Sequence, residues 1–431
     1  MQFFSTNKIS APVDFKEATI QGQAPDKGLY FPEVIPSLPH DFIKNIKSLS
    51  KEEIAFTVIK PYVGNTLKGE ALRNIVEETV NFDIPLIAVS NKVSSLELYH
   101  GPTLAFKDIG ARFMSRCLAH FVQNNKKEIT VLVATSGDTG GAVANGFYEV
   151  EGVNVVILYP SKKVSSVQEL QLTTPGKNIT AIEVSGSFDD CQQMVKQAFT
   201  DYDVSDKIFL TSANSINVAR WLPQQFYYFF AHRQWQHDQP PVIAVPSGNF
   251  GNICAGLLAY SSGLPVQHFI AACNANDVVP NFLKTGKYET KPAIATLSNA
   301  MDVGSPSNFA RIQELFQHKL ESLKAIMSAE SISDAHTAAT LQNVFHDHQY
   351  LLDPHGAVAF AALHNYLQNH PSDKGYILET AHPIKFYDVV EPLIKNKIPV
   401  PREIQVLLTK EKVSIQMDAD YQQLKEFLMY R

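Results

Sequence analysis

The sequence contains few cysteines, and none of them forms a recognisable motif. Cys117, Cys191, Cys254 and Cys273 lie far apart, and no CxxC pair is present. Disulfide frameworks and cysteine-based zinc sites show characteristic cysteine spacings, which are lacking here. We therefore expect four reduced thiols, with no metal site and no disulfide framework.

Long apolar runs and an excess of positive charge are also lacking. No stretch approaches the roughly 18 uninterrupted apolar residues of a membrane span. Residues 1–5 lack the basic start and the apolar run of a secretory signal. The chain has 37 Lys and Arg against 43 Asp and Glu, a net charge of -6, which argues against a broad nucleic-acid surface. We expect a cytoplasmic protein with no nucleic-acid or membrane partner.

What the sequence does contain is an alternation of apolar strands and helical patterns after a mixed N-terminal region. In residues 1–90, turn signals separate short helical stretches such as Glu70–Glu78, which suggests an accessory domain. Beyond it we predict helices at Gly141–Tyr148, at Phe188–Phe199 with Ser187 as its cap, and through Ala259. Predicted strands lie between these helices, at Ile129–Ala134, Val153–Tyr159, Asn178–Val184, Val242–Val245 and Gln267–Ala272.

Repeated strand–helix–strand units predict an α/β fold, in which parallel sheets carry helices on both faces. The length of 431 residues predicts two or three domains at about 150 residues each. We divide the chain into an accessory domain at 1–90, a smaller α/β lobe at 91–215 and a larger α/β lobe at 216–431. Ligands of such sheets bind at the carboxyl ends of the strands, so we expect a cleft between the two lobes.

Two polar turns follow predicted strands. Pro246–Asn252 reads Pro-Ser-Gly-Asn-Phe-Gly-Asn, and its glycines allow the backbone to approach an anion at a helix start. It is neither a Walker loop nor a GxGxxG turn. Thr135–Gly140 is a second turn, rich in hydroxyl groups and containing the acid Asp138. Taken alone, either turn is as compatible with a purely structural role as with ligand binding.

Lys107 is preceded by small and apolar residues within His100–Asp108. Burial would lower the pKa of its amine and make it nucleophilic, although a lysine whose stem packs and whose head reaches water is the commoner case. A further strand end turns into a loop at Leu378–Phe386, where His382 alone is more typical of a structural histidine than of a catalyst.

Together these segments resemble one family. The matching stretches run nearly end to end, and the chain is similar to the threonine synthases, which are fold-type II pyridoxal-phosphate enzymes, in their longer branch with an extended N-terminal domain. The resemblance implies two parallel-sheet lobes of the tryptophan synthase β-like kind plus the accessory domain. The stretches are Gly28–Pro32, His100–Asp108, Thr135–Gly140, Ser212–Asn217, Pro246–Asn252, Asn274–Asp277, Met301–Asn308 and Thr380–Phe386.

The resemblance also implies the roles of individual residues. Lys107 would hold pyridoxal 5'-phosphate as a Schiff base, and the hydroxyl of Thr380 would face the pyridine nitrogen. Asp138 stands where many relatives carry an asparagine near the phenolic oxygen, so an acid there must be protonated or bonded elsewhere. Backbone N–H groups of the loop would hold the cofactor phosphate, from Ser247, Gly248, Asn249, Phe250, Gly251 and Asn252. Thr135, Ser136 and Thr139 would bind the substrate carboxylate, and Arg112, Arg220 and Lys385 are candidates for the substrate phosphate.

The implied reaction converts O-phospho-L-homoserine and water to L-threonine and phosphate, in a monomer or a small homo-oligomer. Two alternatives stay open at this point. A serine or threonine dehydratase shares the fold and the lysine, but Met301–Asn308 and the long N-terminal region disfavour it. A non-catalytic relative that binds the cofactor is disfavoured by the intact Lys107 and by both turns.

Overall fold

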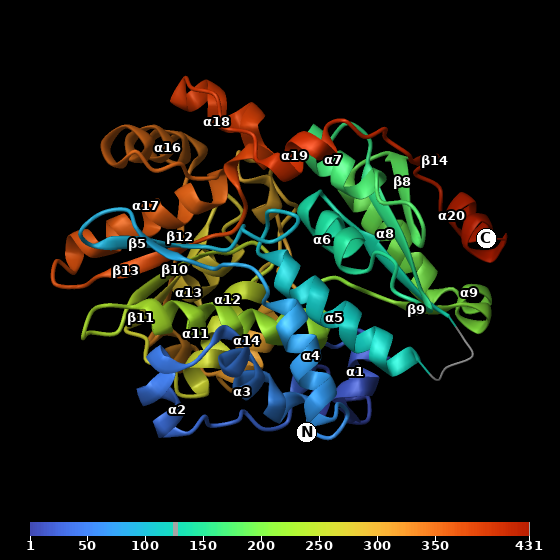
Figure 1. Cartoon of the computed structure of the whole chain (residues 1–431), viewed down its shortest axis with the longest axis horizontal. Helices are drawn as coiled ribbons and strands as arrows, with labels where there is room; N and C mark the ends of the chain where they lie inside the picture. The colour runs from blue at the N-terminus through green and yellow to red at the C-terminus, as the bar shows by residue number, and fades with distance from the viewer. Residues whose placement is uncertain (124–127, 431) are drawn as a thin grey trace.

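The computed structural model describes residues 1–123 and 128–430, whose strands form three sheets. Two are the sheets of an α/β fold, and Figure 1 shows them side by side, the larger lobe on the left and the smaller on the right. The third is small and antiparallel and belongs to the N-terminal region below both lobes. The predicted fold class, two parallel-sheet lobes with an accessory N-terminal region, is confirmed.

The large sheet has the strand order β12-β11-β10-β13-β5-β4, and its ladders are parallel except the one between β4 and β5. Ala244 and Ile270 pack on the side of α16 and α17, whereas their neighbours Ile243 and Phe269 pack on the opposite side with α11 and α12. Alternate residues therefore point to opposite, equally buried faces. The strands are β4 (Leu86–Ala88), β5 (Val93–Glu97), β10 (Val242–Pro246), β11 (His268–Cys273), β12 (Met327–Ser331) and β13 (Gly375–Glu379). The helices are α10 (Val218–Trp221), η2 (Leu222–Gln224), α11 (Gln225–Gln234), α12 (Gly251–Ser261), α13 (Val278–Thr285), η3 (Asn299–Met301), α14 (Phe309–Leu315), α15 (Leu320–Lys324), α16 (Asp334–His348), α17 (Pro354–Asn369), η4 (Pro383–Phe386) and α18 (Tyr387–Ile394).

The small sheet is parallel throughout, in the order β14-β8-β7-β6-β9. Leu132 and Val156 pack in the cluster that includes residues of α8 and α20, and Val131 and Val155 pack on the other face with α5 and α6. The strands are β6 (Ile129–Ala134), β7 (Val153–Pro160), β8 (Ile179–Ser185), β9 (Phe209–Thr211) and β14 (Ile415–Asp418). The helices are α5 (Lys107–Val122), α6 (Asp138–Gly146), α7 (Ser166–Thr173), α8 (Phe188–Thr200), α9 (Tyr202–Lys207), α19 (Arg402–Leu407) and α20 (Tyr421–Tyr430).

The N-terminal region combines the antiparallel strands with a group of helices under the two lobes (Figure 1). In α3 the side chain of Ser50 caps the helix and Glu53 completes a capping box, which fixes its start. The elements are β1 (Gln2–Ser5), β2 (Val13–Asp14), α1 (Phe15–Gln21), β3 (Tyr30–Pro32), α2 (His40–Asn45), η1 (Ile46–Ser48), α3 (Lys51–Val63) and α4 (Gly69–Thr79).

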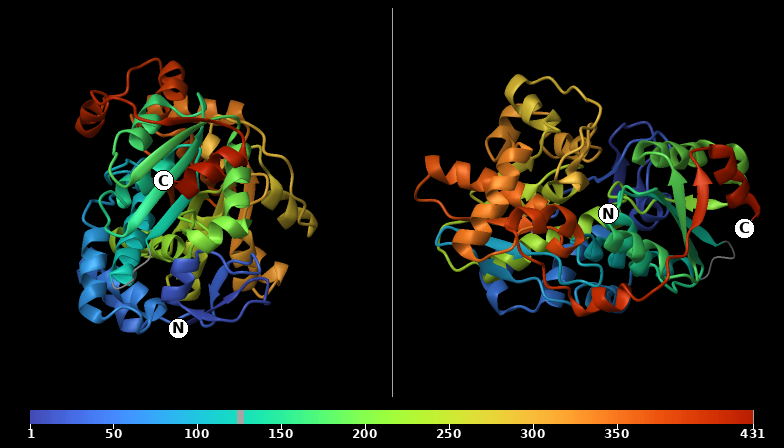
Figure 2. Two further views of the ribbon diagram at one scale, coloured as in Figure 1. Left: turned by 90° about the vertical axis from the view of Figure 1, so that its right-hand side faces the viewer. Right: turned by 90° about the horizontal axis from the view of Figure 1, so that it is seen from above.

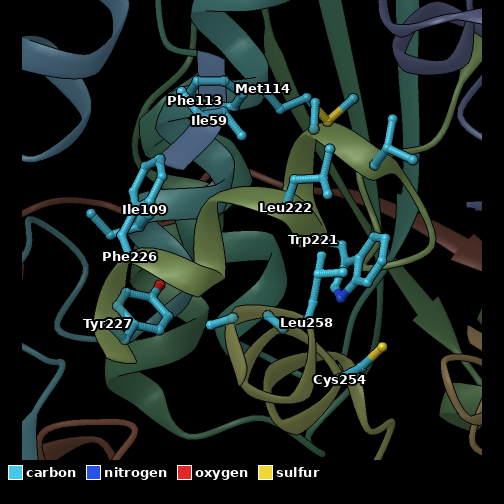
Figure 3. Packing of buried hydrophobic residues seen from close by; sticks show 14 of the residues in the cluster. Ile59, Ile109, Phe113, Met114, Trp221, Leu222, Phe226, Tyr227, Cys254 and Leu258 are labelled. Carbon is cyan, nitrogen blue, oxygen red and sulfur yellow. The ribbon is translucent and has the colours of Figure 1, made fainter. Parts of the chain in front are cut away.

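One continuous apolar core joins these parts, and it anchors the helix that begins at Lys107. Figure 3 shows Ile109 and Phe113 of α5 packed among residues of α10, α11 and α12, including Trp221 and Phe226. The ring of Phe113 meets that of Phe226 edge to face at 6.4 Å. The first turns of α5 are thus fixed against the large lobe, although the helix also covers the small sheet.

Sheet membership does not follow the predicted division into 1–90, 91–215 and 216–431. The strand β5 lies within the range assigned to the smaller lobe but pairs with β13 of the large sheet. The strand β14 lies within the range of the larger lobe but pairs with β8 of the small sheet. Figure 2 shows the C-terminal segment, in red, crossing from one lobe to the other. These long-range pairings correct the contiguous boundaries.

The predicted elements themselves agree well with the structure. The strand β6 has the predicted bounds, and α8 begins after Ser187, whose hydroxyl accepts a hydrogen bond from Asp190 N. The helix α6 begins at Asp138, three residues before the predicted start, because the polar turn itself supplies the first helical turn. All four cysteines are buried free thiols. No helix in the described ranges is long and apolar enough to cross a membrane.

Candidate active site

The site lies at the carboxyl ends of the central strands of the large sheet. The parallel register aligns β10 with β13 and places Glu379 of β13 opposite Glu97 of β5. Just beyond β13, Thr380 O accepts a hydrogen bond of 2.9 Å from Phe106 N, and Ala381 bridges Ala105. The turn before Lys107 is therefore bound directly to the segment that contains Thr380.

Lys107 is the first residue of α5, and its side chain is 18% exposed. Tyr227 donates a hydrogen bond to the carbonyl of Phe106, which fixes the backbone just before the lysine. Burial lowers the pKa of the Lys107 amine; the carboxylate of Asp138 opposes this effect, and the positive charges of Lys385 and Arg220 add to it. A desolvated amine with a lowered pKa is neutral more of the time, and the neutral amine is the nucleophile.

Asp138 lies between two lysines. Its Oδ1 is 2.7 Å from Lys385 Nζ and accepts a hydrogen bond of 3.0 Å from Gln168, while its Oδ2 is 4.0 Å from Lys107 Nζ. Burial alone would raise the pKa of Asp138, but Lys385 and Lys107 outweigh that effect and hold the pKa well below its ordinary value. Of the two possibilities raised by the sequence, Asp138 is bonded elsewhere rather than protonated.

The loop after β10 offers free backbone donors. In the described chain, the N–H groups of Gly248, Asn249, Phe250 and Gly251 have no hydrogen-bond partner, and no side chain caps α12, which starts there. Phe250 has a φ of 60°, which turns the chain into the helix. Uncapped N–H groups at a helix start favour an anion. Ser247 does not share this property, because its N–H donates to Ala272 O and its hydroxyl to Val245 O.

Two further observations fit a phosphate group in this loop. Tyr228 donates to the side-chain oxygen of Asn252, and the buried Asn252 Nδ2 is left without a partner among the described residues. Gly248 lies against Met301, since a Cβ there would be 2.6 Å from the Met301 Cα. The side chain of Asn249 donates to Ser215 Oγ and accepts from the Ser307 N–H, so it joins the loop to two other segments. The residues present therefore fit a phosphate held mainly by backbone N–H groups.

In the second turn, after β6, one hydroxyl shapes the turn and two others are left free in the described part of the chain. The Thr135 hydroxyl accepts hydrogen bonds from Gly137 N and Gly140 N, so it shapes the turn. Ser136 and Thr139 are partly exposed, and their hydroxyls have no partner in residues 1–123 and 128–430. These two side chains are free to meet a ligand.

The predicted substrate-phosphate cations are not arranged as expected. Arg112 donates to the carbonyl of Glu78 at the end of α4, so it caps that helix instead of facing the site. Lys385 is fully buried and is committed to Asp138 and to Thr103 O, at 2.9 Å. Arg220 donates to the Ala213 carbonyl, but its buried Nε has no partner in the described chain.

Sequence reasoning missed several partners of the site. Gln168 on α7 binds Asp138, and Ser215 binds both Asn249 and Asn308. A group of buried acids beneath the strand ends was also missed, and no local pattern marks it, because its members come from three distant segments. They are Glu97, Glu379 and Asp353.

Asp353 links that group to the segment that contains Thr380. Its Oδ2 accepts a hydrogen bond of 3.0 Å from Ala381 N, its Oδ1 is 2.7 Å from His355 Nδ1, and its own N–H donates to Glu379 Oε1. His382 is neutral near pH 7, since burial lowers its pKa to about 4, and its Nδ1 accepts from Ile384 N. Nδ1 of His382 is thus bonded within its own turn. No group of three or more His, Cys, Asp or Glu in the described ranges could hold a metal ion.

Three family models match the chain. One described as "Pyridoxal-phosphate dependent enzyme" matches residues 92–378, one described as "Threonine synthase N terminus" matches residues 2–80, and one described as "Threonine synthase, C-terminal" matches residues 356–428. Curated threonine synthases also match the whole chain at 41–42% identity. The chain belongs to the threonine synthase family. Both the resemblance stated from the sequence and the predicted cofactor, pyridoxal 5'-phosphate, are confirmed by this membership.

Relatives in the threonine synthase family match over full length. The curated threonine synthases of Escherichia coli (strain K12) and Haemophilus influenzae are 41% and 42% identical over 431 residues, covering 100% of this chain and 99% and 100% of those proteins. The crystal structure of the Escherichia coli enzyme matches with a TM-score of 0.93 at 40% identity, over 100% of this chain and 99% of that one. Threonine synthase from Brucella melitensis, solved with PLP bound, matches with a TM-score of 0.92 at 32% identity, over 99% and 98%. Maize serine racemase, at 17% identity over 72% of this chain and 93% of that one, with a TM-score of 0.55, shares the fold alone.

Proposed function

We propose that this chain is a lyase that converts O-phospho-L-homoserine and water to L-threonine and phosphate. The observation that carries the proposal is the placement of Lys107, a largely buried amine of lowered pKa, beside Thr380 and Asp138 at the carboxyl edge of the large sheet. Family membership supports the same reaction, since the curated relatives are named threonine synthase.

The cofactor would be held at three points. The N–H groups of Gly248 to Gly251 and the Asn252 amide would bind its phosphate, Thr380 would offer its hydroxyl to the pyridine nitrogen, and Lys107 would attach it covalently. Pyridoxal phosphate, when bound, supplies a conjugated ring that takes up negative charge from the substrate α-carbon. Asp138, ionised and bonded to Lys385, would place a negative charge near Lys107 instead of donating a proton.

Lys107 would also act as the base. Its amine, once free, would remove the proton from the α-carbon, and an amine of lowered pKa suits repeated proton transfer near neutral pH. A proton would then leave the β-carbon and phosphate the γ-carbon, which would gain a proton. Water would finally add its hydroxyl at the β-carbon, and the α-carbon would regain the proton that Lys107 had removed. Ser136 and Thr139, with hydroxyls free in the described chain, would bind the substrate carboxylate on the turn that Thr135 shapes.

Arg220 is the cation that we retain for the substrate phosphate, because its buried Nε has no partner in the described ranges. Arg112 and Lys385 are not retained, since their donors are engaged elsewhere. A cytoplasmic location and a monomer or small homo-oligomer stay predictions.

The test is phosphate release from O-phospho-L-homoserine, with L-threonine and oxo-acid measured in the same samples. Wild-type protein should release phosphate and threonine together, and Lys107→Ala should be slower by about 10²–10⁴ fold, as expected for losing a general base. Release of an oxo-acid from serine or threonine at a higher rate would favour a dehydratase. Near-normal phosphate release by Lys107→Ala would contradict the assignment of Lys107.

A further inference from the structure

The ion pair between Lys385 and Asp138 joins the two lobes inside the protein. Lys385 lies in η4, directly after β13 of the large sheet, and Asp138 begins α6, directly after β6 of the small sheet. Their charged atoms are 2.7 Å apart, and the side chains are 0% and 4% exposed. Burying two charges is costly unless their geometry and their remaining hydrogen bonds are good, so the contacts around this cross-lobe pair decide what it does.

Those contacts hold the pair firmly on one side of the carboxylate. Gln168 donates to the same Asp138 oxygen, Oδ1, that faces Lys385. The Lys385 amine donates in turn to Thr103 O, a carbonyl that also accepts a hydrogen bond of 3.0 Å from Gln171 of α7. Asp138 is thereby held by two partners at Oδ1, and only Oδ2 faces Lys107.

Lys385 and Lys107 could both pair with the Asp138 carboxylate, and the distances show which of them binds it directly. Lys385 is at hydrogen-bond distance, whereas Lys107 Nζ is 4.0 Å from Oδ2, beyond a direct hydrogen bond. If Lys107 bound Asp138 directly, its amine would be protonated and would donate to the carboxylate. A protonated amine is a poor nucleophile because its lone pair is occupied by the proton.

We propose that Lys385 is a positioning residue that occupies Asp138 and so leaves the Lys107 amine free to react. The inference rests on the proposed function in one respect, namely that Lys107 is the cofactor lysine. It also replaces the expectation that Lys385 binds the substrate phosphate, a role that needs an amine open to the substrate.

Four charged groups on four different elements act on Lys107. Asp138 of α6 and Asp353, the cap of α17, favour its charged form, and Lys385 of η4 and Arg220 of α10 oppose it. Removing Lys385 takes away one opposing charge and also releases Asp138 toward Lys107. Removing the Asp138 charge leaves the positive charges of Lys385 and Arg220 less opposed, and these charges lower the pKa of Lys107. The two substitutions must therefore move the pKa of Lys107 in opposite directions.

The experiment measures the pKa of Lys107 in the full-length chain without cofactor or substrate. Competitive labelling with acetic anhydride across a pH series, read by mass spectrometry at Lys107, gives this value without any turnover. In Lys385→Met the midpoint should rise by about 1 pH unit or more, the usual effect of an opposite charge moving within about 4–6 Å. In Asp138→Asn it should fall. The double variant, in which no buried charge of the pair is left alone, should lie near wild type.

The controls separate this role from the alternatives. Lys397→Met removes an exposed lysine that pairs with Glu391 and should leave the Lys107 midpoint unchanged. Circular dichroism checks that each variant is folded. If Lys385→Met does not fold, the proposal is still supported when the Lys107 midpoint falls in Asp138→Asn and returns toward the wild-type value in the double variant. An unchanged midpoint in either folded single variant overturns it, as does a fall in Lys385→Met.

Failure of the proposed function would look different. A protein that shows the predicted Lys107 shifts but releases no phosphate from O-phospho-L-homoserine would refute the reaction and leave the positioning role standing. A protein that turns over the substrate but shows no shift would refute only the positioning role.

Discussion

The carboxyl group of Glu379 should be neutral in the folded protein, and replacing it with glutamine should therefore remove a pH-dependent loss of stability. Glu379 is fully buried at the end of β13. Burial raises its pKa well above the ordinary value, and the negative charge of Asp353 raises it further. One oxygen accepts the Asp353 N–H, and the other, Oε2, has no partner among the described residues.

The sign of the effect follows from proton uptake. Below the ordinary pKa of 4.5, Glu379 is protonated in both the folded and the unfolded chain. As the pH rises, the unfolded chain releases this proton and the folded chain keeps it, so the free energy of unfolding falls. The loss is about 1.4 kcal/mol per pH unit until the pKa of the folded state is reached.

The assay is urea unfolding of wild type and Glu379→Gln between pH 5 and pH 8. Because glutamine does not ionise, the variant should become more stable relative to wild type as the pH rises, by at most about 1.4 kcal/mol per pH unit, until the pKa of the folded state is reached. Glu97→Gln is the matched control, and its stability relative to wild type should not change with pH between pH 5 and pH 8. Burial opposes ionisation of Glu97, but hydrogen bonds from His100, Tyr350 and Tyr99 outweigh it and lower the pKa. Its contribution to stability is present above the ordinary pKa and is lost as the pH falls. Parallel curves for wild type and Glu379→Gln would show that Glu379 is ionised in the folded protein.

The phosphate loop, Thr380 and Arg112 can each be tested by substitution. Gly248→Ala should lose cofactor on dialysis and unfold more easily, since its Cβ would lie 2.6 Å from the Met301 Cα. In Gly251→Ala the nearest atom to the new Cβ is 3.3 Å away, so this variant should keep the fold. Equal stability and equal cofactor retention in the two variants would refute the packing argument. Thr380→Asp should raise the proton affinity of the cofactor ring nitrogen, and an unchanged absorbance spectrum and product ratio would exclude Thr380 as the ring partner. Arg112→Ala should cost about 1–2 kcal/mol of unfolding free energy and leave KM unchanged; a raised KM would return Arg112 to the substrate site.

The parts of the fold that the sequence predicts are those governed by local physics. The apolar run of β6 and the Ser187 cap of α8 depend on residues within a few positions, and both were predicted correctly. The pairing of β14 with β8 depends on a contact across the whole C-terminal half. No periodicity near residue 415 indicates which sheet that strand joins, so the contiguous lobes were wrong there.

The same distinction separates the site residues. Lys107 stands out because small and apolar residues precede it, and the two polar turns stand out because they follow apolar strands. Lys385 was predicted to bind the substrate phosphate, but its partner Asp138 comes from the other lobe, and the carbonyl that it also binds lies 282 positions away. A side chain's neighbours in space decide whether its charge is free for a ligand, and a single sequence does not contain that information.

The donors left without partners agree with the charges that the proposed reaction brings in. Substrate and cofactor carry three anionic groups: the cofactor phosphate, the substrate carboxylate and the substrate phosphate. Among the donors that the described chain leaves unused, three sets are those that we assign to these anions: the N–H groups of 248–251 with Asn252 Nδ2, the hydroxyls of Ser136 and Thr139, and Arg220 Nε. Buried donors without partners are costly, so an anion that binds at Asn252 Nδ2 or at Arg220 Nε would offset that cost. Lys385 and Asp138 already satisfy each other, and this is why the pair acts on Lys107 rather than on the substrate.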